Sequence, residues 1–159
     1  MSKLTLTALG AILIFLLWSV VVGRGANKEL GAYLGMWTGQ LSSDDLKMTG
    51  YLRLKGANKQ FEMHLEGPQQ AVDVTGTWAL EKASSLVLRA TDVKIDDFGG
   101  AAKRDPNKPY LDNGDLREAY ASPFVLKLTQ NKETLESLPL QIGGARFTHR
   151  FDRTFGNVR

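Results

Sequence analysis

The feature that most constrains this chain is an uncharged, apolar stretch over residues 4–22. It is about nineteen residues long, and a helix of that length covers roughly 28 Å, close to the ~30 Å hydrocarbon core of a bilayer. A cleavable signal peptide is the alternative, because Gly23 and Gly25 place small residues at positions −3 and −1 before Ala26. Signal-peptide apolar regions span only about 7–15 residues, so we expect a retained transmembrane helix over residues 1–23.

The flanks of this stretch bear on its orientation. Lys3 precedes it, and Arg24 and Lys28 follow it, so the positive-inside rule favours neither direction strongly. A very short N-terminal tail before one long apolar segment is typical of an uncleaved signal-anchor, which leaves the rest of the chain outside. We therefore expect a single-pass protein of the cell inner membrane, with a short linker over residues 24–33 and a periplasmic or otherwise extracytoplasmic domain over residues 34–159.

The composition excludes several classes of protein. From Ala26 onward there are 18 Lys and Arg against 17 Asp and Glu, a net charge of +1, so the domain is not basic enough to predict a nucleic-acid partner. The chain has no cysteine, which excludes disulfides, thiolate metal sites, cysteine nucleophiles and lipid attachment through cysteine.

Alternation with a period of two predicts an all-β domain. Met48, Leu52 and Leu54 share one face of a segment whose other face is polar, and the same pattern repeats in later segments. Many short strands joined by Gly, Asn and Pro turns predict a closed antiparallel up-and-down barrel of about eight strands. We expect strands at residues 46–55, 59–66, 71–80, 85–90, 93–95, 123–129, 135–142 and 145–152, and another opening near Gly35.

Two tryptophan motifs carry a resemblance to a known family. The sequence GMWTGQL at residues 35–41, with GTWAL at 76–80 and LVL at 86–88, resembles a bacterial lipocalin-like domain over residues 34–90. In that group a G-x-W strand opens a small up-and-down barrel and the tryptophan closes one end. The resemblance implies an apolar ligand inside the barrel, and the side chains expected to line such a cavity are Trp37, Trp78, Phe147, His149 and Phe151.

The two histidines fall on opposite faces of their strands. His149 shares a face with Phe147 and Phe151 and is expected to point inward, as a cavity residue or as a hydrogen-bonded core residue, whereas His64 is expected on the solvated face. We therefore predict no metal site shared by the two.

Residues 96–122 interrupt the strand pattern with a run rich in Gly, Asp, Asn and Pro. A loop of this length contacts a partner or is a flexible insertion without a role, and residues 115–120 favour a short helical turn. The last strand carries several arginines outward, suited to anionic headgroups or an acidic partner, or else to a solubilising strand edge. The residues expected to contact a partner are Asp97, Arg104, Tyr110, Asp115, Arg146 and Arg150.

No motif in the sequence indicates catalysis. The run from Asp112 to Asp115, with Glu118, holds oxygen ligands at loop spacing but lacks the residue order of a calcium loop, and there is no serine-nucleophile or phosphate-binding motif. We predict no catalytic residues, no cofactor and no metal.

These observations favour an accessory or interaction subunit of a membrane protein assembly, with the bilayer and other membrane subunits as partners. The alternative is a lipocalin-like carrier of a small apolar ligand such as a lipid or pigment. A hydrolase or isomerase on the same scaffold would need several polar groups converging inside the barrel, and the alternation supplies only His149.

Overall fold

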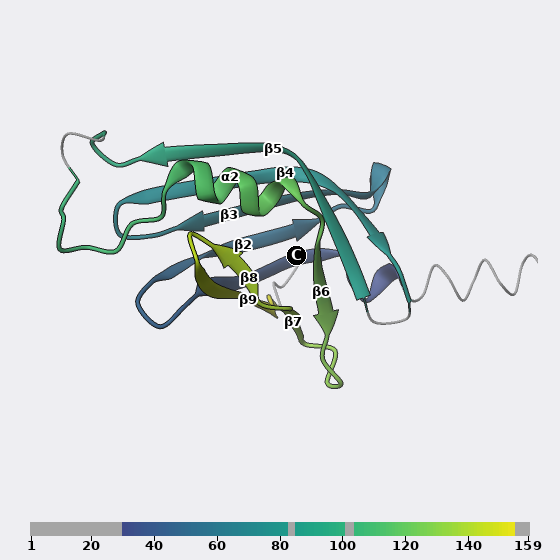
Figure 1. Cartoon of the computed structure of the whole chain (residues 1–159). Coiled ribbons are helices and arrows are strands. Elements are labelled where there is room, and N and C mark those ends of the chain that lie inside the picture. The colour runs from purple at the N-terminus through teal and green to yellow at the C-terminus, as the bar shows by residue number, and fades with distance from the viewer. Residues whose placement is uncertain (1–29, 83–84, 101–103, 155–159) are drawn as a thin grey trace, which may run out of the picture. The chain divides into compact units, whose positions relative to one another are not determined.

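The computed structural model describes residues 30–82, 85–100 and 104–154 (Figure 1). The chain divides into two compact units, Met1–Tyr33 and Leu34–Arg159. The expected transmembrane helix over residues 1–23 and most of the linker over 24–33 lie outside the described residues. Over the described ranges, no helix combines the length and apolar character needed to cross a bilayer.

The second unit is all-β apart from one α-helix and one short 3₁₀ turn in the residues described, as the alternation predicted. The strands are β1 (Gly35–Ser42), β2 (Lys47–Leu54), β3 (Gln60–Glu66), β4 (Gln70–Leu80), β5 (Ser85–Asp97), β6 (Phe124–Leu128), β7 (Thr134–Ser137), β8 (Leu140–Ile142) and β9 (Ala145–Arg153). The 3₁₀ turn η1 (Ala57–Lys59) precedes β3, and the helix α2 (Asn113–Ala121) precedes β6.

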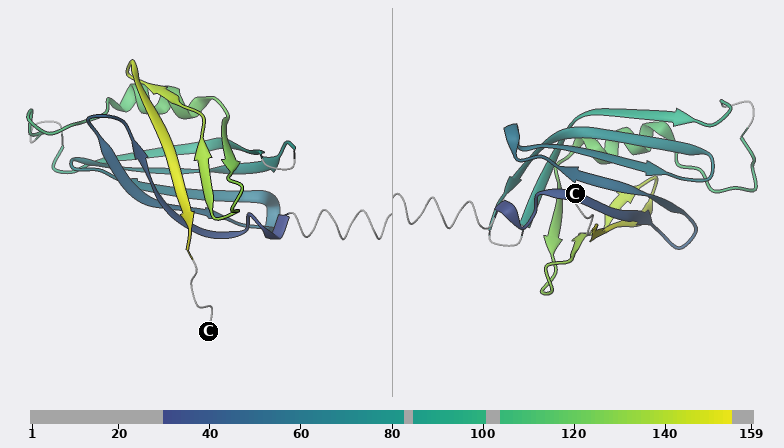
Figure 2. Two further views of the ribbon diagram at one scale, coloured as in Figure 1. Left: turned by 90° about the horizontal axis from the view of Figure 1, so that it is seen from below. Right: turned by 180° about the vertical axis from the view of Figure 1, so that it is seen from behind.

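Eight of the strands close into an antiparallel barrel. Their order is β1-β2-β3-β4-β5-β6-β7-β9, and β9 pairs back onto β1 from Trp37 opposite Arg153 to Ser42 opposite Thr148. The extra strand β8 pairs with the first half of β9 through a two-residue Gly143-Gly144 turn, in which both glycines have positive φ as tight hairpins require. The closed barrel is compatible with the lipocalin-like architecture that the tryptophan motifs suggested (Figures 1 and 2).

The barrel has two distinct ends. The proximal end is the one where β1 begins, and it carries the hairpin loops after β2, β4 and β6, because Gly35 lies opposite Leu54 and the later pairings continue in register. The distal end carries the β1–β2 loop, the β3–β4 turn, the segment between β5 and α2, and the β8–β9 turn. The two ends therefore differ in structure, since only the distal one has long additions.

The inward faces of the strands form the core, and the residues on those faces follow the period-two alternation that the sequence shows. Trp37 is fully buried, and Trp78 is buried with its Nε1 donating to the backbone oxygen of Lys55 at 3.0 Å. That bond satisfies the indole N–H at the proximal end, where a tryptophan needs one polar partner. The other fully buried inward side chains include Leu41, Met48, Leu52, Leu65, Val72, Val74, Leu86, Leu88, Leu126, Leu135 and Phe151.

Two inward glycines let neighbouring strands coil closely. Gly39 and Gly50 lie opposite each other on β1 and β2. A Cβ at Gly39 would sit 2.0 Å from the backbone oxygen of Arg150, and one at Gly50 would sit 1.8 Å from that of His64. The tight curvature of this side of the barrel therefore depends on positions without a side chain.

The structure differs from the sequence prediction around residues 93–122. The two short strands expected at 85–90 and 93–95 are one strand, β5, whose register against β4 shifts between Thr75 and Gly76. The sequence pattern does not reveal that β5 is continuous, because a bulge changes which residues face inward and so interrupts the alternation. The helical turn expected over 115–120 is instead the longer helix α2.

Replacing Gly50 by alanine should destabilise the barrel by about 2–3 kcal/mol, because the added methyl group meets backbone that cannot move without breaking the sheet. Equilibrium denaturant unfolding would measure the loss. Thr49→Ala is the matched control, since Thr49 is exposed on the outer face of the same strand and should change the unfolding free energy by only roughly 0.5 kcal/mol. Equal stabilities of the two variants would contradict the proposed close approach.

Candidate functional site

Two buried glutamines hold the segment that precedes α2 against the distal end. Gln69 Nε2 donates to the backbone oxygens of Asp105 at 3.2 Å and Lys108 at 2.8 Å, and its Oε1 accepts from Asp105 N at 2.7 Å. Gln70 makes the matching pair with Leu111, donating to its oxygen at 3.2 Å and accepting from its N–H at 2.8 Å. Because buried amides need such partners, the segment from Asp105 to Leu111 is part of the folded domain.

A polar network lies beside these glutamines, centred on Asp97. Arg104 Nη2 donates to Asp97 Oδ2 at 2.9 Å, Asn113 Nδ2 donates to the same oxygen at 3.1 Å, and Tyr110 donates to Oδ1 at 3.2 Å. The Arg104 guanidinium also lies 3.6 Å from the centre of the Tyr110 ring, a cation–π contact. The network joins the end of β5, the connecting segment and the start of α2.

The ionisation of this network follows from its contacts. Desolvation acts most strongly on Asp97 and would raise its pKa, but the hydrogen bonds from Arg104, Asn113 and Tyr110, with the Arg104 charge, bring the pKa below its ordinary value. Burial and the nearby Asp97 carboxylate raise the pKa of the Tyr110 hydroxyl. Asp97 is thus ionised and Tyr110 protonated at neutral pH.

Asp112 is the N-cap of α2, and its carboxylate accepts from the backbone N–H groups of Gly114 and Asp115. This role explains the run from Asp112 to Asp115 that faintly suggested a calcium loop. No group of three His, Asp or Glu side chains that could hold a metal ion occurs among the residues of known placement. One face of α2 is buried through Leu116, Ala119 and Tyr120.

The same helix covers an open strand edge. β5 pairs with β6 only over Ser85 to Leu88, so the remainder of its outer edge has no neighbouring strand in the sheet. α2 lies along this edge, and Arg117 Nη1 donates to the backbone oxygen of Val93 at 3.2 Å (Figure 2). A covered edge cannot recruit another strand.

Inside the barrel, α2 meets β9 through a buried polar pair. The hydroxyl of Tyr120 and Nε2 of His149 are 2.9 Å apart, and both side chains are fully buried. The His149 ring stacks between Phe124 and Phe151, with ring centres 5.3 and 5.9 Å away. The backbone N–H of His149 donates to Ser137 Oγ at 2.9 Å, whereas the ring Nδ1 has no hydrogen-bond partner among the described residues.

Burial dominates the ionisation of this pair. It lowers the pKa of His149 to about 3 and raises that of Tyr120 well above its ordinary value. Both groups are therefore neutral at physiological pH, and one donates to the other. This chemistry suits a structural link better than a proton-transfer site.

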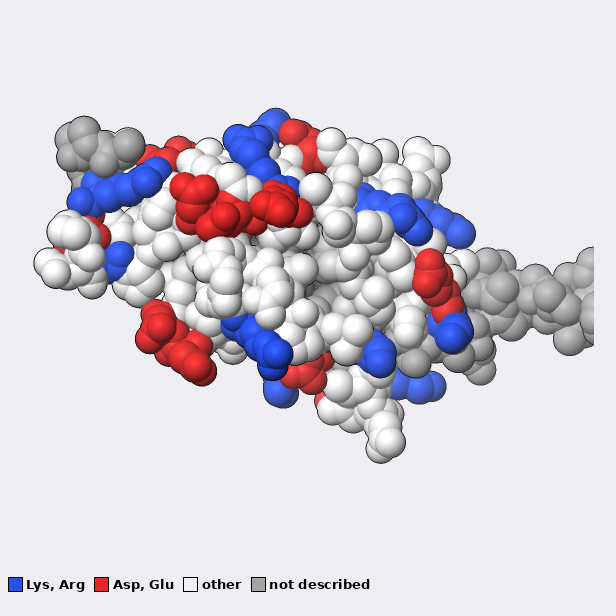
Figure 3. All heavy atoms as spheres, viewed as in Figure 1, with Lys and Arg blue, Asp and Glu red and all other residues white. Residues whose placement is uncertain are grey.

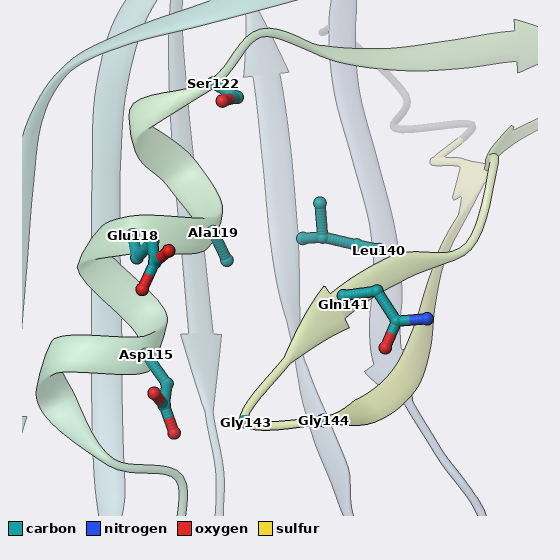
Figure 4. A pocket seen from close by; sticks show the side chains of 8 residues that line it. All are labelled: Asp115, Glu118, Ala119, Ser122, Leu140, Gln141, Gly143 and Gly144. Carbon is teal, nitrogen blue, oxygen red and sulfur yellow. The ribbon is translucent and has the colours of Figure 1, made fainter.

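Two adjacent hollows open on the outside of the distal end. The first, of about 540 Å³, lies between α2 and the β8–β9 hairpin, with Asp115 and Glu118 on the helix wall and Leu140, Gln141 and the two turn glycines on the other (Figure 4). The second, also about 540 Å³, is lined by the β1–β2 loop, the segment at Arg104 to Asp112 and the hairpin. They share Asp115 and Gly143, so they form one broad concave surface, called here the distal surface.

The structure brings three of the six expected contact residues to the distal surface. Arg104, Tyr110 and Asp115 line it, and Asp97 holds Arg104 and Tyr110 from behind. Arg146 lies opposite Gln141 in the hairpin beside it. Arg150 is not part of it, because it lies farther along β9 opposite Gln40 and Glu136, with Asp152 at 3.9 Å.

The residues expected to line a ligand cavity are all buried and inward, namely Trp37, Trp78, Phe147, His149 and Phe151. Sequence reasoning missed the groups that organise the distal end. Gln69 and Gln70 follow an ordinary Gly-Pro turn and have no distinguishing pattern, and Tyr120 was the last residue of the short helical turn expected within the loop over residues 96–122. Only the helical spacing of Leu116, Ala119 and Tyr120 could have indicated a buried face there.

Comparisons of this chain with protein-family models, with curated proteins and with solved structures give no match. The site is therefore interpreted from its own geometry.

Acid should destabilise the domain through His149. The native state keeps this side chain neutral down to about pH 3, whereas the unfolded chain takes up a proton below about pH 6.5. Stability is therefore constant above that pH and falls as the pH drops from there toward 3, by about 2 kcal/mol at pH 5. Urea unfolding at pH 7 and pH 5 would measure the change.

The matched control is the double variant Tyr120→Phe with His149→Phe, which removes both polar partners together and leaves neither unpaired. It should lose less stability than the wild type between pH 7 and pH 5. An equal loss in both proteins would assign the acid sensitivity to other groups.

Gln69→Met should release the segment before α2 while the barrel stays folded, because it removes the acceptor for Asp105 N and the donors to Asp105 and Lys108. Hydrogen exchange of the Asp105 amide should become faster, and that of the β2 and β3 amides should not change. Gln60→Met, at an exposed position on β3, serves as the control. Unchanged exchange at Asp105 would show that Gln69 does not hold the segment.

Proposed function

We propose that this protein is a membrane-anchored, non-catalytic accessory or interaction subunit of a membrane protein assembly. In this proposal residues 1–23 hold the chain in the inner membrane, and a lipocalin-like barrel over residues 34–159 lies on the periplasmic side. The distal surface is the part that contacts another subunit. The observation that carries the proposal is the contrast between a filled barrel interior and an ordered concave surface outside it.

The filled interior argues against the alternative, a carrier of a small apolar ligand. A cavity that holds a ligand has walls that a water-sized sphere can touch. The side chains along the barrel axis have no such exposed area, among them Trp37, Leu52, Leu126, His149 and Phe151. A ligand would have to displace several of them.

The same burial argues against a catalytic role inside the barrel. His149 and Tyr120 meet there, but both are fully buried and each contacts the other. A catalytic group must reach a substrate, and neither group has access to one.

The construction of the distal surface supports a role in binding. Its backbone is held by Gln69 and Gln70, its polar side chains by Asp97, and its helix by the Asp112 cap. A surface fixed in this way loses little conformational entropy when it binds a partner. Acidic Asp115 and Glu118 and basic Arg146 supply charge for specificity at its border.

Site-specific photocrosslinking in native membranes tests this proposal. A photoreactive residue in place of Gln141, which lines the first hollow, should yield a discrete crosslinked product that contains another membrane protein. The matched control is the same residue in place of Thr75, on the outer wall of β4, which should give none. No product from position 141, together with a monomeric chain released from the membrane without detergent, would overturn the proposal.

A further inference from the structure

The proximal end carries lysines in an unusual backbone conformation. Four non-glycine residues have positive φ among those described, and three of them are Lys59 at 48°, Lys82 at 118° and Lys132 at 59°. The fourth, Asn58 at 59°, neighbours Lys59. One such lysine occurs in each of the hairpin loops after β2, β4 and β6, so the three loops share a feature that their sequences do not.

Left-handed backbone is unfavourable for lysine and much less so for glycine or asparagine. Turns that need it usually carry one of those two residues. The three lysines occupy different positions in their loops, so no single turn geometry explains the residue, and we attribute its choice to the side chain. Backbone outliers of this kind tend to occur where a residue has a function.

No charged side chain among the described residues pairs with these lysines. Each is exposed, and no ion pair joins Lys59, Lys82 or Lys132 to a carboxylate in the described part of the chain, whereas nearby Lys55 is paired with Glu62. The three loops, residues 55–59, 81–84 and 129–133, together contain four lysines against Glu81 and Glu133, a net charge of +2. Figure 3 shows basic side chains at the end where these loops lie and also elsewhere on this face, with acidic ones gathered over α2.

The location of these lysines indicates what they contact. β1 begins at the proximal end, so the chain reaches the barrel there, only twelve residues after the apolar stretch that ends at Val22. Basic side chains next to a membrane anchor are attracted to anionic headgroups within about a Debye length of the surface. Exposed Met36, at the start of β1, adds an apolar side chain at the same end.

We propose that the proximal end of the barrel binds anionic phospholipid headgroups through Lys59, Lys82 and Lys132, and that this contact orients the distal surface away from the membrane. The inference rests on the proposed function for the anchor that brings this end to the bilayer. It adds a lipid contact and an orientation that the anchor alone does not provide.

The test uses the full-length chain reconstituted with vesicles of phosphatidylcholine alone, or with about a third phosphatidylglycerol. Flotation reports whether the chain is bound to the vesicles, and hydrogen exchange reports which backbone amides are protected. In the anionic vesicles the loops after β2, β4 and β6 should gain protection over the neutral vesicles, and high salt should abolish the gain. Each lysine should raise the equilibrium constant for contact between the loops and the anionic surface about five-fold, and all three together should raise it roughly a hundred-fold at low salt.

The test variant is Lys59→Asn with Lys82→Asn and Lys132→Asn, because asparagine tolerates left-handed backbone and should leave the barrel at least as stable. It should lose the gain in protection while its melting temperature stays equal or rises. The matched control replaces three exposed lysines elsewhere, Lys47, Lys94 and Lys108, by asparagine. It removes the same charge and should keep the gain.

The outcomes separate this inference from the proposed function. Flotation with both kinds of vesicle, without extra protection of the loops in the anionic ones, would overturn the headgroup contact and leave the anchor in place. Flotation with anionic vesicles alone, lost in the test variant, would support the contact and overturn the anchor. Flotation with neither kind would overturn both, and equal behaviour of the test and control variants would overturn the contact.

Discussion

Closure of the barrel between β1 and β9 is the constraint on which the rest of this structure depends. The first strand of the domain pairs with the last one over six residues, from Trp37 to Ser42. The inward residues of β1 and β9 are brought into one enclosed core only when β9 pairs with β1. This long-range pairing therefore defines the core. Gly39 permits it, because β9 passes where a Cβ would be.

Part of the outer edge of β5 has no neighbouring strand in the barrel, and the additions at the distal end cover that edge. β5 is longer than its neighbour β6 and would expose a free edge. The helix α2 covers that edge, and its other contacts reach the interior through Tyr120 and His149. The connecting segment before α2 is in turn held by Gln69 and Gln70. The distal surface is thus a consequence of how the barrel is completed.

The two ends of the barrel differ in chemistry as well as in structure. The proximal end has short hairpin loops with lysines in left-handed conformations, and the distal end has a concave surface bordered by carboxylates on α2. The proposed function, with one end toward a membrane and the other toward a protein, would use this difference. The interior, filled by side chains without exposed area, separates the two ends.

The sequence by itself determined the all-β class, the inward faces of the strands and the inward position of His149, because a period of two follows directly from strand geometry. It also grouped Arg104, Tyr110 and Asp115 in one segment, and the structure brings these three residues to one hollow. Only the tertiary structure decided that β5 is continuous across a bulge, that Tyr120 is the partner of His149, and that Gln69 and Gln70 hold a segment about forty positions away. These features depend on contacts between residues distant in the chain, which leave no local periodicity to read.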